Sequence, residues 1–426
     1  MEEWKEYKLG DLIVLSSGGT PNKSNSSYWG GDIPWISAKA MYDDYLYSSD
    51  MTITREGLNN GSKLAPVNSI LLLTRGSGLF NRIPVCLVKR EMAFNQDVKC
   101  IESINQNIVS TLFLFYWLMG NKQEISNILE TTGIGAGKID TERLKGIHIK
   151  LPPIQIQQVL IKFAESLMLK IEVNRRINEN LEQQAQALFK SWFVDFEPFR
   201  DGEFVESELG MIPKGWRVGR YDEIIESTIS GDWGKESPEG NYTHKVACIR
   251  GCDFQDIKNG LRGKTPERYI LEKNFQTKHF KDKDVLVEIS GGTATVSTGR
   301  VCPVSQLLID KFNEDIVCTN FCRLVRPKPS YGAYLYYSWL YKFNNKVMFG
   351  YENGTSGIKN FRIKDFTSLE PIVIPSESSL QLFQSMIDKL QMKLQMNGSE
   401  SQKLASLRDT LLPKLMSGEL KVNEIA

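Results

Sequence analysis

The segments of this chain that most resemble catalytic motifs each lack residues that the chemistry needs. The segment Gly133-Ile134-Gly135-Ala136-Gly137-Lys138 resembles a phosphate-binding loop, but Thr132 and Ile139 replace the Gly and the Ser or Thr that such a loop requires. Pro152-Pro153 is the only Pro-Pro pair, and its neighbours are not those of an adenine-methyltransferase motif. The sequence therefore predicts no ATP site and no methyltransferase site in this chain.

Carboxylates and histidines do not form a recognisable nuclease or metal site either. Asp284 and Glu288 resemble a nuclease carboxylate pair, but Ser290 stands where a Lys is expected. The histidines, which have no metal-ligand spacing, are His148, His244 and His279. No nucleophile, base and orienting group come together. We therefore expect a chain that is not an enzyme and has no metal or cofactor of its own.

Two pairs of cysteines, Cys248 with Cys252 and Cys318 with Cys322, have three residues between their members. A zinc site is possible, but its pairs usually lie closer together on tight turns. Both pairs stand in strand-like runs, where residues four apart share a face, so we expect them to be buried together. The odd total of seven cysteines argues against a disulfide framework and for a reducing compartment.

Basic and amide side chains in or beside loops rich in Gly, Asn or Pro are better candidates for function. The first half of the chain has Lys39, Arg75, Arg82, Asn95, Gln96 and Lys138 in such places. The second half has Arg250, Lys264, Arg268, Arg300, Asn320, Lys359 and Arg362. Arg and Lys read guanine and hold phosphates, while Asn and Gln read adenine. These residues are candidate DNA contacts, although many loop residues of this kind are only solvated.

A sequence repeat supplies the elements that would position these side chains. Residues 4–12 return as 216–224, residues 70–77 as 285–292, residues 112–118 as 334–340, and residues 151–152 as 374–375. Between these anchors the two copies diverge. A duplicated frame with different contents indicates two similar modules that each recognise something different.

The repeat also suggests which candidate contacts share a role. The matching pairs of basic residues are Arg82 with Arg300 and Lys138 with Lys359. A role common to both modules, such as phosphate contact, suits these pairs. Base readout must differ between the modules, so it suits unmatched positions such as Arg75 against Ser290.

Each module is followed by a long amphipathic helix, predicted over residues 153–197 and 376–416. Apolar residues follow the alternating spacing of a coiled-coil seam, and both seams become polar in the middle. The polar residues are Asn174 and Asn178 in the first helix and Asn397 and Ser401 in the second. These polar steps would meet in an antiparallel pair, although two separate amphipathic helices remain an alternative. Gly398 is expected to weaken or bend the second helix.

Large apolar residues crowd the end of each helix. They are Phe189, Trp192, Phe193 and Phe196 in the first helix and Leu411, Leu412, Leu415 and Met416 in the second. One seam cannot bury them all, and surplus apolar groups mark an interface. We expect them to anchor a partner protein; the alternative is packing on the neighbouring module.

The composition fits this organisation. A length of 426 residues suggests two or three domains, and 41% hydrophobic residues is ordinary for globular cores. The net charge of +1 is nearly neutral, so any DNA binding by the chain alone is expected to be modest. No signal peptide is visible, and the longest apolar run, residues 108–119, is too short to span a bilayer. The chain is predicted to be soluble and cytoplasmic, without a membrane partner.

The ordered set of motifs resembles the specificity (S) subunit of a Type I restriction-modification system. The segments that carry the resemblance are residues 4–12 and 209–216, Leu73-Thr74-Arg75-Gly76-Ser77, Phe94-Asn95-Gln96-Asp97-Val98-Lys99, Ile149-Lys150-Leu151-Pro152-Pro153, Leu188-Phe189-Lys190-Ser191-Trp192-Phe193 and residues 407–413. The second copy departs from the pattern. Thr319-Asn320-Phe321-Cys322 replaces the Asn-Gln-Asp run, and Ser290-Gly291-Gly292 replaces Arg-Gly-Ser.

The resemblance implies an α+β fold with two mixed α/β target recognition domains related by internal duplication and separated by two long antiparallel coiled-coil helices. The predicted parts are target recognition domain 1 (1–152), the first helix (153–197), a linker (198–215), target recognition domain 2 (216–375), the second helix (376–416) and a tail (417–426). Each recognition domain would read one half of a split, asymmetric site in double-stranded DNA.

The resemblance also implies partners. The helices would set the gap between half-sites and dock two modification subunits, which carry S-adenosylmethionine and methylate an adenine amino group. Restriction subunits, with endonuclease and translocase activity that uses ATP and Mg, would join the larger complex.

Three alternatives stay open. A stand-alone DNA-binding regulator with two half-site readers would need high affinity without partners, which the near-neutral charge disfavours. An enzyme with an unrecognised site is disfavoured by the missing motifs. A specificity module of another DNA modification or defence assembly would share the same sequence features.

Overall fold

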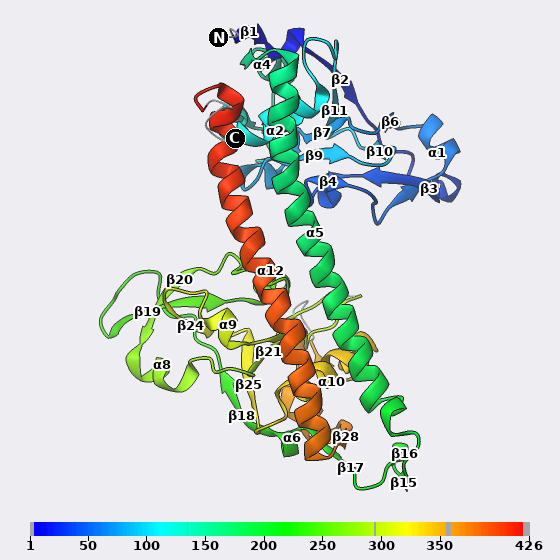
Figure 1. Ribbon diagram of the computed structural model, residues 1–426, viewed down its shortest axis with the longest axis vertical. Coiled ribbons are helices and arrows are strands. Elements are labelled where there is room, and N and C mark those ends of the chain that lie inside the picture. Colours follow the sequence, from blue (N-terminus) through cyan, green and yellow to red (C-terminus); the bar gives the residue numbers. More distant parts are fainter. Residues whose placement is uncertain (1–3, 134, 294, 355–358, 421–426) are drawn as a thin grey trace. The chain divides into compact units, whose positions relative to one another are not determined.

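The computed structural model describes residues 4–133, 135–293, 295–354 and 359–420. The chain folds into two compact units: unit 1 contains residues 1–170 and 404–426, and unit 2 contains residues 171–403. Each unit combines a mixed α/β domain with parts of both long helices (Figure 1). We call residues 4–152 domain 1 and residues 216–375 domain 2. Of the predicted parts, residues 421–426 of the tail and Ile134 of the phosphate-loop-like segment lie outside the described residues.

Domain 1 is built from small sheets around a main core and a smaller cluster of Trp35, Ile53, Leu58 and Ala93. Its largest sheet has the strand order β2 (Ile13–Ser17), β11 (Val98–Ser103), β7 (Ile70–Leu73), β9 (Val85–Val88) and β4 (Tyr45–Leu46). A second sheet has the order β5 (Thr52–Ile53), β3 (Trp29–Ile36), β10 (Met92–Phe94) and β6 (Lys63–Ala65). A third has the order β12 (Leu129–Thr131), β13 (Gly137–Ile139) and β8 (Arg75–Gly76), and β1 (Lys5–Lys8) pairs with β14 (His148–Leu151).

The helices of domain 1 are α1 (Arg55–Asn59), α2 (Thr111–Gly120), α3 (Lys122–Asn127) and α4 (Thr141–Lys145). The apolar run 108–119 forms most of α2, in which nearly every side chain from Phe113 to Met119 is buried. A helix that is apolar on all sides belongs in the middle of a core. The start of α5 (Ile154–Phe193) and the end of α12 (Glu377–Ser417) complete this core. Among the described residues, no helix is both long and apolar enough to cross a membrane.

Domain 2 repeats the plan with changed edges. Its main sheet has the order β18 (Ile225–Ser230), β25 (Cys322–Pro327), β21 (Val285–Glu288) and β23 (Val301–Pro303). A second sheet has the order β20 (Glu267–Leu271), β19 (Tyr242–Ile249) and β24 (Asp315–Cys318). A third sheet has the order β22 (Ser290–Gly291), β27 (Lys359–Phe361) and β26 (Glu352–Asn353). In addition, β17 (Arg217–Arg220) pairs with β28 (Pro371–Ile374). The helices are α6 (Tyr221–Ile224), α7 (Phe254–Lys258), α8 (Glu272–Lys278), α9 (Gln306–Ile309), α10 (Gly332–Asn344) and α11 (Ile363–Leu369).

The polar steps of the two long helices meet as predicted, and their pairing in unit 2 is antiparallel. Asn397 Nδ2 donates to Asn178 Oδ1 at 2.9 Å, and Asn174 Nδ2 donates to Ser401 Oγ at 3.2 Å. Asn178 Nδ2 also donates to the Leu394 carbonyl at 3.1 Å. Buried amides at a seam fix its register because a shifted pairing would leave them without partners.

Gly398 has a different role from the expected one. It lies inside α12, which is a single helix from Glu377 to Ser417. A Cβ at Gly398 would stand 2.3 Å from the Gly260 carbonyl oxygen. The glycine therefore allows the turn at Gly260, itself at φ +76°, to pack directly against the helix backbone.

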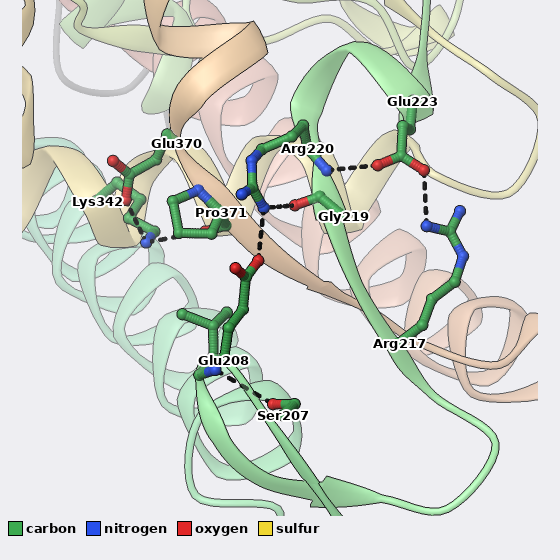
Figure 2. A network of polar contacts seen from close by, with 10 residues as sticks. Ser207, Glu208, Arg217, Gly219, Arg220, Glu223, Lys342, Glu370 and Pro371 are labelled. Atoms are coloured by element: carbon green, nitrogen blue, oxygen red, sulfur yellow. Dashed lines mark hydrogen bonds and ion pairs between the residues drawn. The ribbon is translucent and has the colours of Figure 1, made fainter.

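The predicted linker is folded. Residues 204–213 form a hairpin of β15 (Phe204–Ser207) and β16 (Gly210–Pro213). Arg220 at the end of β17 donates from Nη1 to Glu208 Oε1 at 2.9 Å, and its backbone N donates to Glu223 Oε1 at 2.7 Å (Figure 2). These contacts attach the hairpin to domain 2.

Each long helix follows its module in the chain, as predicted, but the two compact units share both helices. Each unit takes the N-terminal part of one helix and the C-terminal part of the other. Domain 2 thus packs on the second half of α5 as well as on α12, because Phe189 and Phe193 belong to the same core as Phe383 and Ile387.

Candidate functional site

Loops that follow two parallel strands form a matched site in each domain. In domain 1, β3 and β10 are parallel, so Lys39 after β3 and Gln96 after β10 lie at the same edge of the sheet. In domain 2, β19 and β24 are parallel, which brings Cys252 and Asn320 to the corresponding edge. We call these the strand-end sites. The carboxyl ends of parallel strands are where α/β sheets commonly bind ligands.

The same backbone hydrogen bonds hold both sites and fix which residues correspond. The bond from Asn95 N to Ile36 O (2.9 Å) in domain 1 matches the bond from Thr319 N to Ile249 O (3.0 Å) in domain 2. In the same way, the bond from Thr74 N to Asp97 O (2.8 Å) matches the bond from Ile289 N to Phe321 O (2.8 Å). The bond from Ala40 N to Ser37 O (2.9 Å) matches the bond from Asp253 N to Arg250 O (3.0 Å). The corresponding residues at the sites are therefore Lys39 and Cys252, Arg75 and Ser290, Gln96 and Asn320, and Asp97 and Phe321. The frame is shared, while the side chains differ in charge and polarity.

The site of domain 1 is polar. Asn95 is buried, and its side chain closes the turn by accepting from the Asp97 backbone N at 3.2 Å. This bond leaves Gln96 exposed, with its Oε1 accepting from Thr20 Oγ1 at 2.7 Å. Lys39 is exposed in the 3₁₀ turn Ala38–Ala40. Of the predicted residues, Asn95 thus positions its neighbour, while Lys39 and Gln96 face solvent.

Basic side chains gather beside this turn. Arg75 in β8 is exposed and stands directly opposite Lys138 in β13. Lys99 in β11, which the sequence analysis did not single out, donates to Ser17 Oγ at 2.5 Å. Burial, followed by the nearby Arg75 guanidinium, lowers the pKa of Lys99. The domain 1 site therefore concentrates positive charge, and Lys138 has only a long ion pair of 3.7 Å with Asp140.

The site of domain 2 is a cavity of about 420 Å³. The residues that line it are Trp233, Arg250, Gly251, Cys252, Glu288, Ser290, Thr319, Asn320 and Phe321. Phe321 is 63% exposed at its rim, where domain 1 has Asp97. Cys252 and Ser290 thus stand where domain 1 has the basic residues Lys39 and Arg75, and Phe321 stands where it has the acidic Asp97.

Arg250, which lines this cavity, and Arg300, which pairs with the lining residue Glu288, already have carboxylate partners. Arg300 holds Glu288 in a bidentate pair, with Nε to Oε2 at 2.7 Å and Nη2 to Oε1 at 2.6 Å. Arg250 holds Asp253 in the same way, at 3.0 Å on each side, and also donates to the Lys264 carbonyl. These hydrogen bonds raise the pKa of both guanidinium groups. Their charge is locally neutralised and their fork geometry is already occupied.

Other predicted residues lie around the sites in varied settings. Lys264 is exposed, and Arg82 is half-buried after the 3₁₀ turn Ser77–Phe80. Arg268 is 8% exposed, stacks 3.8 Å from the Trp233 ring centroid and pairs with Glu236 at 2.9 Å. Lys359 pairs with Glu352 at 2.8 Å and Arg362 with Asp365 at 2.6 Å. Buried Arg268 supports the cavity wall.

Both pairings of basic residues from the repeat are wrong. Leu73 N donates to Pro84 O as Glu288 N donates to Arg300 O, so Arg300 corresponds to Pro84 and not to Arg82. Arg75 stands opposite Lys138 as Ser290 stands opposite Asn360, so Lys138 corresponds to Asn360 and not to Lys359. A shift of one residue turns a strand side chain to the opposite face. The argument for shared phosphate contacts at these pairs therefore fails.

The crowded apolar residues at the helix ends are core residues. Phe189, Trp192 and Phe193 are buried in unit 2, and the Phe193 ring lies 4.9 Å from Phe383 and 5.0 Å from Tyr334, centroid to centroid. Phe196 packs edge-on against Trp216 at 5.8 Å. Leu412, Leu415 and Met416 are buried in the core of unit 1, with Leu411 packed against it. The expected partner anchors are thus largely covered by the chain's own domains, because domain 2 packs on α5 and domain 1 on α12.

Cysteines follow the prediction only in part. Cys318 ends β24 and Cys322 begins β25, and both are buried in one core. Cys248 is also buried, but Cys252 lies in the 3₁₀ turn Gly251–Asp253 and is exposed. Cys248 and Cys252 do not share a strand, because β19 ends at Ile249. Among the described residues, no group of three or more His, Cys, Asp or Glu side chains could hold a metal ion.

Comparison with known proteins finds similarity to specificity subunits of Type I restriction enzymes. Residues 1–183 match the family described as "Type I restriction modification DNA specificity domain". The chain is 28% identical to the Type I restriction enzyme MjaIX specificity subunit of Methanocaldococcus jannaschii, covering all of this chain and 95% of the relative. It is 27% identical to the HindI specificity subunit of Haemophilus influenzae, covering 99% of this chain and 100% of the relative. The EcoR124I/EcoR124II specificity subunit of Escherichia coli is 30% identical over 47% of each chain.

The fold and the paired sites define a two-domain α+β protein with a coiled-coil seam. Along its whole length the chain is similar to specificity subunits of Type I restriction enzymes. A solved S subunit of a Type I restriction-modification system from M. genitalium has a TM-score of 0.49 at 16% identity, covering 97% of this chain and 96% of that chain.

Proposed function

We propose that the chain is the DNA sequence-recognition subunit of a Type I restriction-modification complex, and that its strand-end sites read the two halves of a bipartite, asymmetric site. The observation that carries this proposal is the shared backbone frame with different side chains, as at Asp97 and Phe321. Each half-site needs the same approach of backbone to duplex but different contacts to base edges. The partner subunits carry out methylation and cleavage, and this chain recognises the DNA sequence without catalysing either reaction.

Domain 1 has the stronger electrostatic attraction for DNA. Arg75, Lys99 and Lys138 stand together, whereas Arg250 and Arg300 at the domain 2 site are paired with carboxylates. Exposed Gln96 and Asn320 occupy the same backbone position and can each offer an amide to adenine. We propose that Lys39, Arg75, Gln96, Lys138 and Asn320 contact DNA, with Asn95 holding Gln96 in place.

The partner surface that we propose is the outer side of α12. Leu382, Met386, Met392 and Met396 are between 36% and 58% exposed. Their spacing places them within about a third of the helix circumference. Exposed apolar side chains that lie on one face indicate an interface, and methionine adapts well to a partner. We propose that a modification subunit docks here, with a second copy on the remaining helix surface.

The cofactors of the reaction belong to these partners. S-adenosylmethionine is proposed to be bound by the modification subunits, and ATP with Mg by the restriction subunits. The long helices are proposed to set the unread gap between the half-sites, since a helix of about 40 residues is a stiff rod.

Genome-wide mapping of methylated adenine tests the proposal. Cells that express this chain with its modification subunit should show one bipartite motif, absent from cells that lack the chain. Replacing residues 1–152 with the domain of a relative should change one half of the motif and leave the other intact. A map without a motif, or a replacement that changes both halves, would contradict the proposal. Methylation of DNA by the purified chain alone would contradict the assignment of catalysis to partners.

A further inference from the structure

The cavity of domain 2 has two aromatic walls, Trp233 and Phe321, beside polar lining residues that include Asn320. Trp233 lies inside it, and its ring is fixed by the Arg268 guanidinium stacked at 3.8 Å. Phe321 forms the rim and is 63% exposed. Asn320, the preceding residue, is also exposed. An amide therefore stands beside an aromatic recess.

The charges around the cavity do not favour a guanine or phosphate contact. Arg300 is bound bidentately by Glu288, and Arg250 is bound by Asp253. A guanidinium that holds a carboxylate through both of its parallel N–H groups cannot at the same time present them to guanine O6 and N7. Glu288 is likewise occupied and is only 8% exposed, so it does not offer an acceptor for cytosine.

The remaining features match the major-groove edge of an A·T base pair. That edge presents adenine N7 and N6 next to thymine O4 and the thymine methyl group. An asparagine amide can accept from N6 and donate to N7, and an apolar recess can hold the methyl group. Resting on the proposed function, we propose that domain 2 reads an A·T pair, with Asn320 on the adenine and the cavity between Trp233 and Phe321 around the thymine methyl.

Domain 1 supplies the internal contrast. Asp97 replaces Phe321 and turns the rim into a charged surface, where a methyl group would be unfavourable. Gln96 keeps an amide at the position of Asn320. The inference thus predicts that sensitivity to the thymine methyl belongs to the domain 2 half-site and to the pair that Asn320 contacts.

The experiment uses the chain assembled with its modification subunits and duplexes that carry the motif found by methylation mapping. Thymidine is replaced by deoxyuridine, one position at a time, and binding is measured by fluorescence anisotropy. At one pair of the domain 2 half-site, loss of the methyl group should weaken binding about fourfold, the factor expected for one buried methyl group. Replacing the adenine of that pair with 7-deazaadenine, which lacks N7, should weaken binding about tenfold.

Variants assign these effects to side chains. Phe321→Ala should abolish the difference between thymine and uracil while keeping the effect of 7-deazaadenine. Asn320→Ala should do the reverse. Leu369→Ala, which removes another exposed apolar side chain of domain 2 (62% exposed), is the matched control and should keep both effects.

The outcomes separate the inference from the function on which it rests. Equal binding of A·T and A·U at every pair of the domain 2 half-site, or a half-site without an A·T pair, would overturn the inference and leave the proposed function standing. The uracil measurement uses the unaltered chain, so a variant that fails to fold does not remove this test. A methylation map with no bipartite motif would overturn both.

Discussion

Domain 1 and domain 2 hold their strand-end sites with the same backbone hydrogen bonds, yet the electrostatic character of the two sites differs. In domain 1, Arg75 and Lys39 are exposed, and neither has an ion pair with a carboxylate among the described residues. In domain 2, Arg250 and Arg300 are each bound to a carboxylate, and the centre of the site is an aromatic cavity. One fold thus supports a positively charged surface in one copy and a nearly neutral recess in the other.

The difference shows how a duplicated reader can acquire two specificities. Turns closed by backbone hydrogen bonds tolerate a change of side chain, because the bond between Thr74 N and Asp97 O needs no particular residue at position 97. Phe321 can therefore stand at the corresponding place without a change of fold. Charge that domain 2 does not present must come from domain 1 or from partner subunits if the complex is to hold DNA.

The largest effect is expected from separating the two readers. We expect that seven residues inserted after Lys170 in α5, with seven inserted after Lys403 in α12, add one heptad and keep the seam in register. These positions are the boundaries between the two units, so neither core is interrupted. The helices lengthen by about 10 Å, which equals about three base pairs of duplex.

Methylation mapping of this variant should show both half-sites unchanged and a gap about three base pairs longer. Activity at the original site should be lost. Insertion into α5 alone is the control, since it adds a heptad to one helix without a matching heptad in the other and should not give a folded, active variant with a longer gap. An unchanged gap in a folded, active variant would show that the helices do not set the distance.

The sequence predicted the features that depend on periodicity and order, and it failed where tertiary packing decides. The heptad spacing located α5 and α12, and the polar step predicted the contact of Asn178 with Asn397. Lys39 and Gln96 were predicted only as separate loop residues, and the structure brings them to one edge because both follow parallel strands. The partners of Arg300 could not be foreseen, since Glu288 is brought to it by sheet pairing.

Single-residue alignment between the copies was the weakest step. The number of residues between matching anchors changes along the chain, and one-residue errors placed Lys359 opposite the wrong partner. For Phe193 the partner surface was preferred, and the alternative of packing on the neighbouring module is the one that the structure supports. The Asp97-to-Phe321 exchange became meaningful only once backbone hydrogen bonds had aligned the two sites.

The next largest effect tests the aromatic cluster that only domain 2 places on α5. Phe193→Ala should lower the free energy of unfolding of unit 2 by about 3–5 kcal/mol, because Phe193 is 4% exposed and contacts Trp216, Tyr334 and Phe383. Hydrogen exchange should show faster opening of domain 2 and unchanged protection of domain 1. Val173→Ala is the control on an exposed part of the same helix. A variant with normal stability that no longer binds a modification subunit would show that these aromatic residues contact the partner and do not stabilise the core.

A smaller and opposite pair of effects is expected from one arginine in each site. Arg75→Gln should leave thermal stability unchanged but reduce the salt dependence of DNA binding by about one unit of slope, because an exposed cation no longer displaces a counterion. Arg300→Gln should leave that slope unchanged and destabilise domain 2 by about 2 kcal/mol, because Glu288 loses its partner in a largely buried position. Calorimetry and anisotropy at several salt concentrations measure both. A lowered salt slope for Arg300→Gln would mean that its guanidinium does reach phosphate, and that the contrast between the domains is weaker than the ion pairs suggest.

The smallest effect concerns the one feature that the two sites share, an exposed amide at the same backbone position. Gln96→Asn shortens the side chain by one methylene group and Asn320→Gln lengthens it by one, while the chemistry of the amide stays the same. If each amide contacts an adenine in its own half-site, each exchange should weaken binding by about 1 kcal/mol, the lower limit for a displaced base contact. The loss should vanish when 7-deazaadenine replaces the contacted adenine of that half-site, and it should be unaffected by the same replacement in the other half. Gln96→Asn also loses the hydrogen bond from Thr20, so Thr20→Val in an otherwise unaltered chain measures that contribution separately. Losses that appear equally with adenine and 7-deazaadenine in both halves would show that the amides shape their loops and do not read bases.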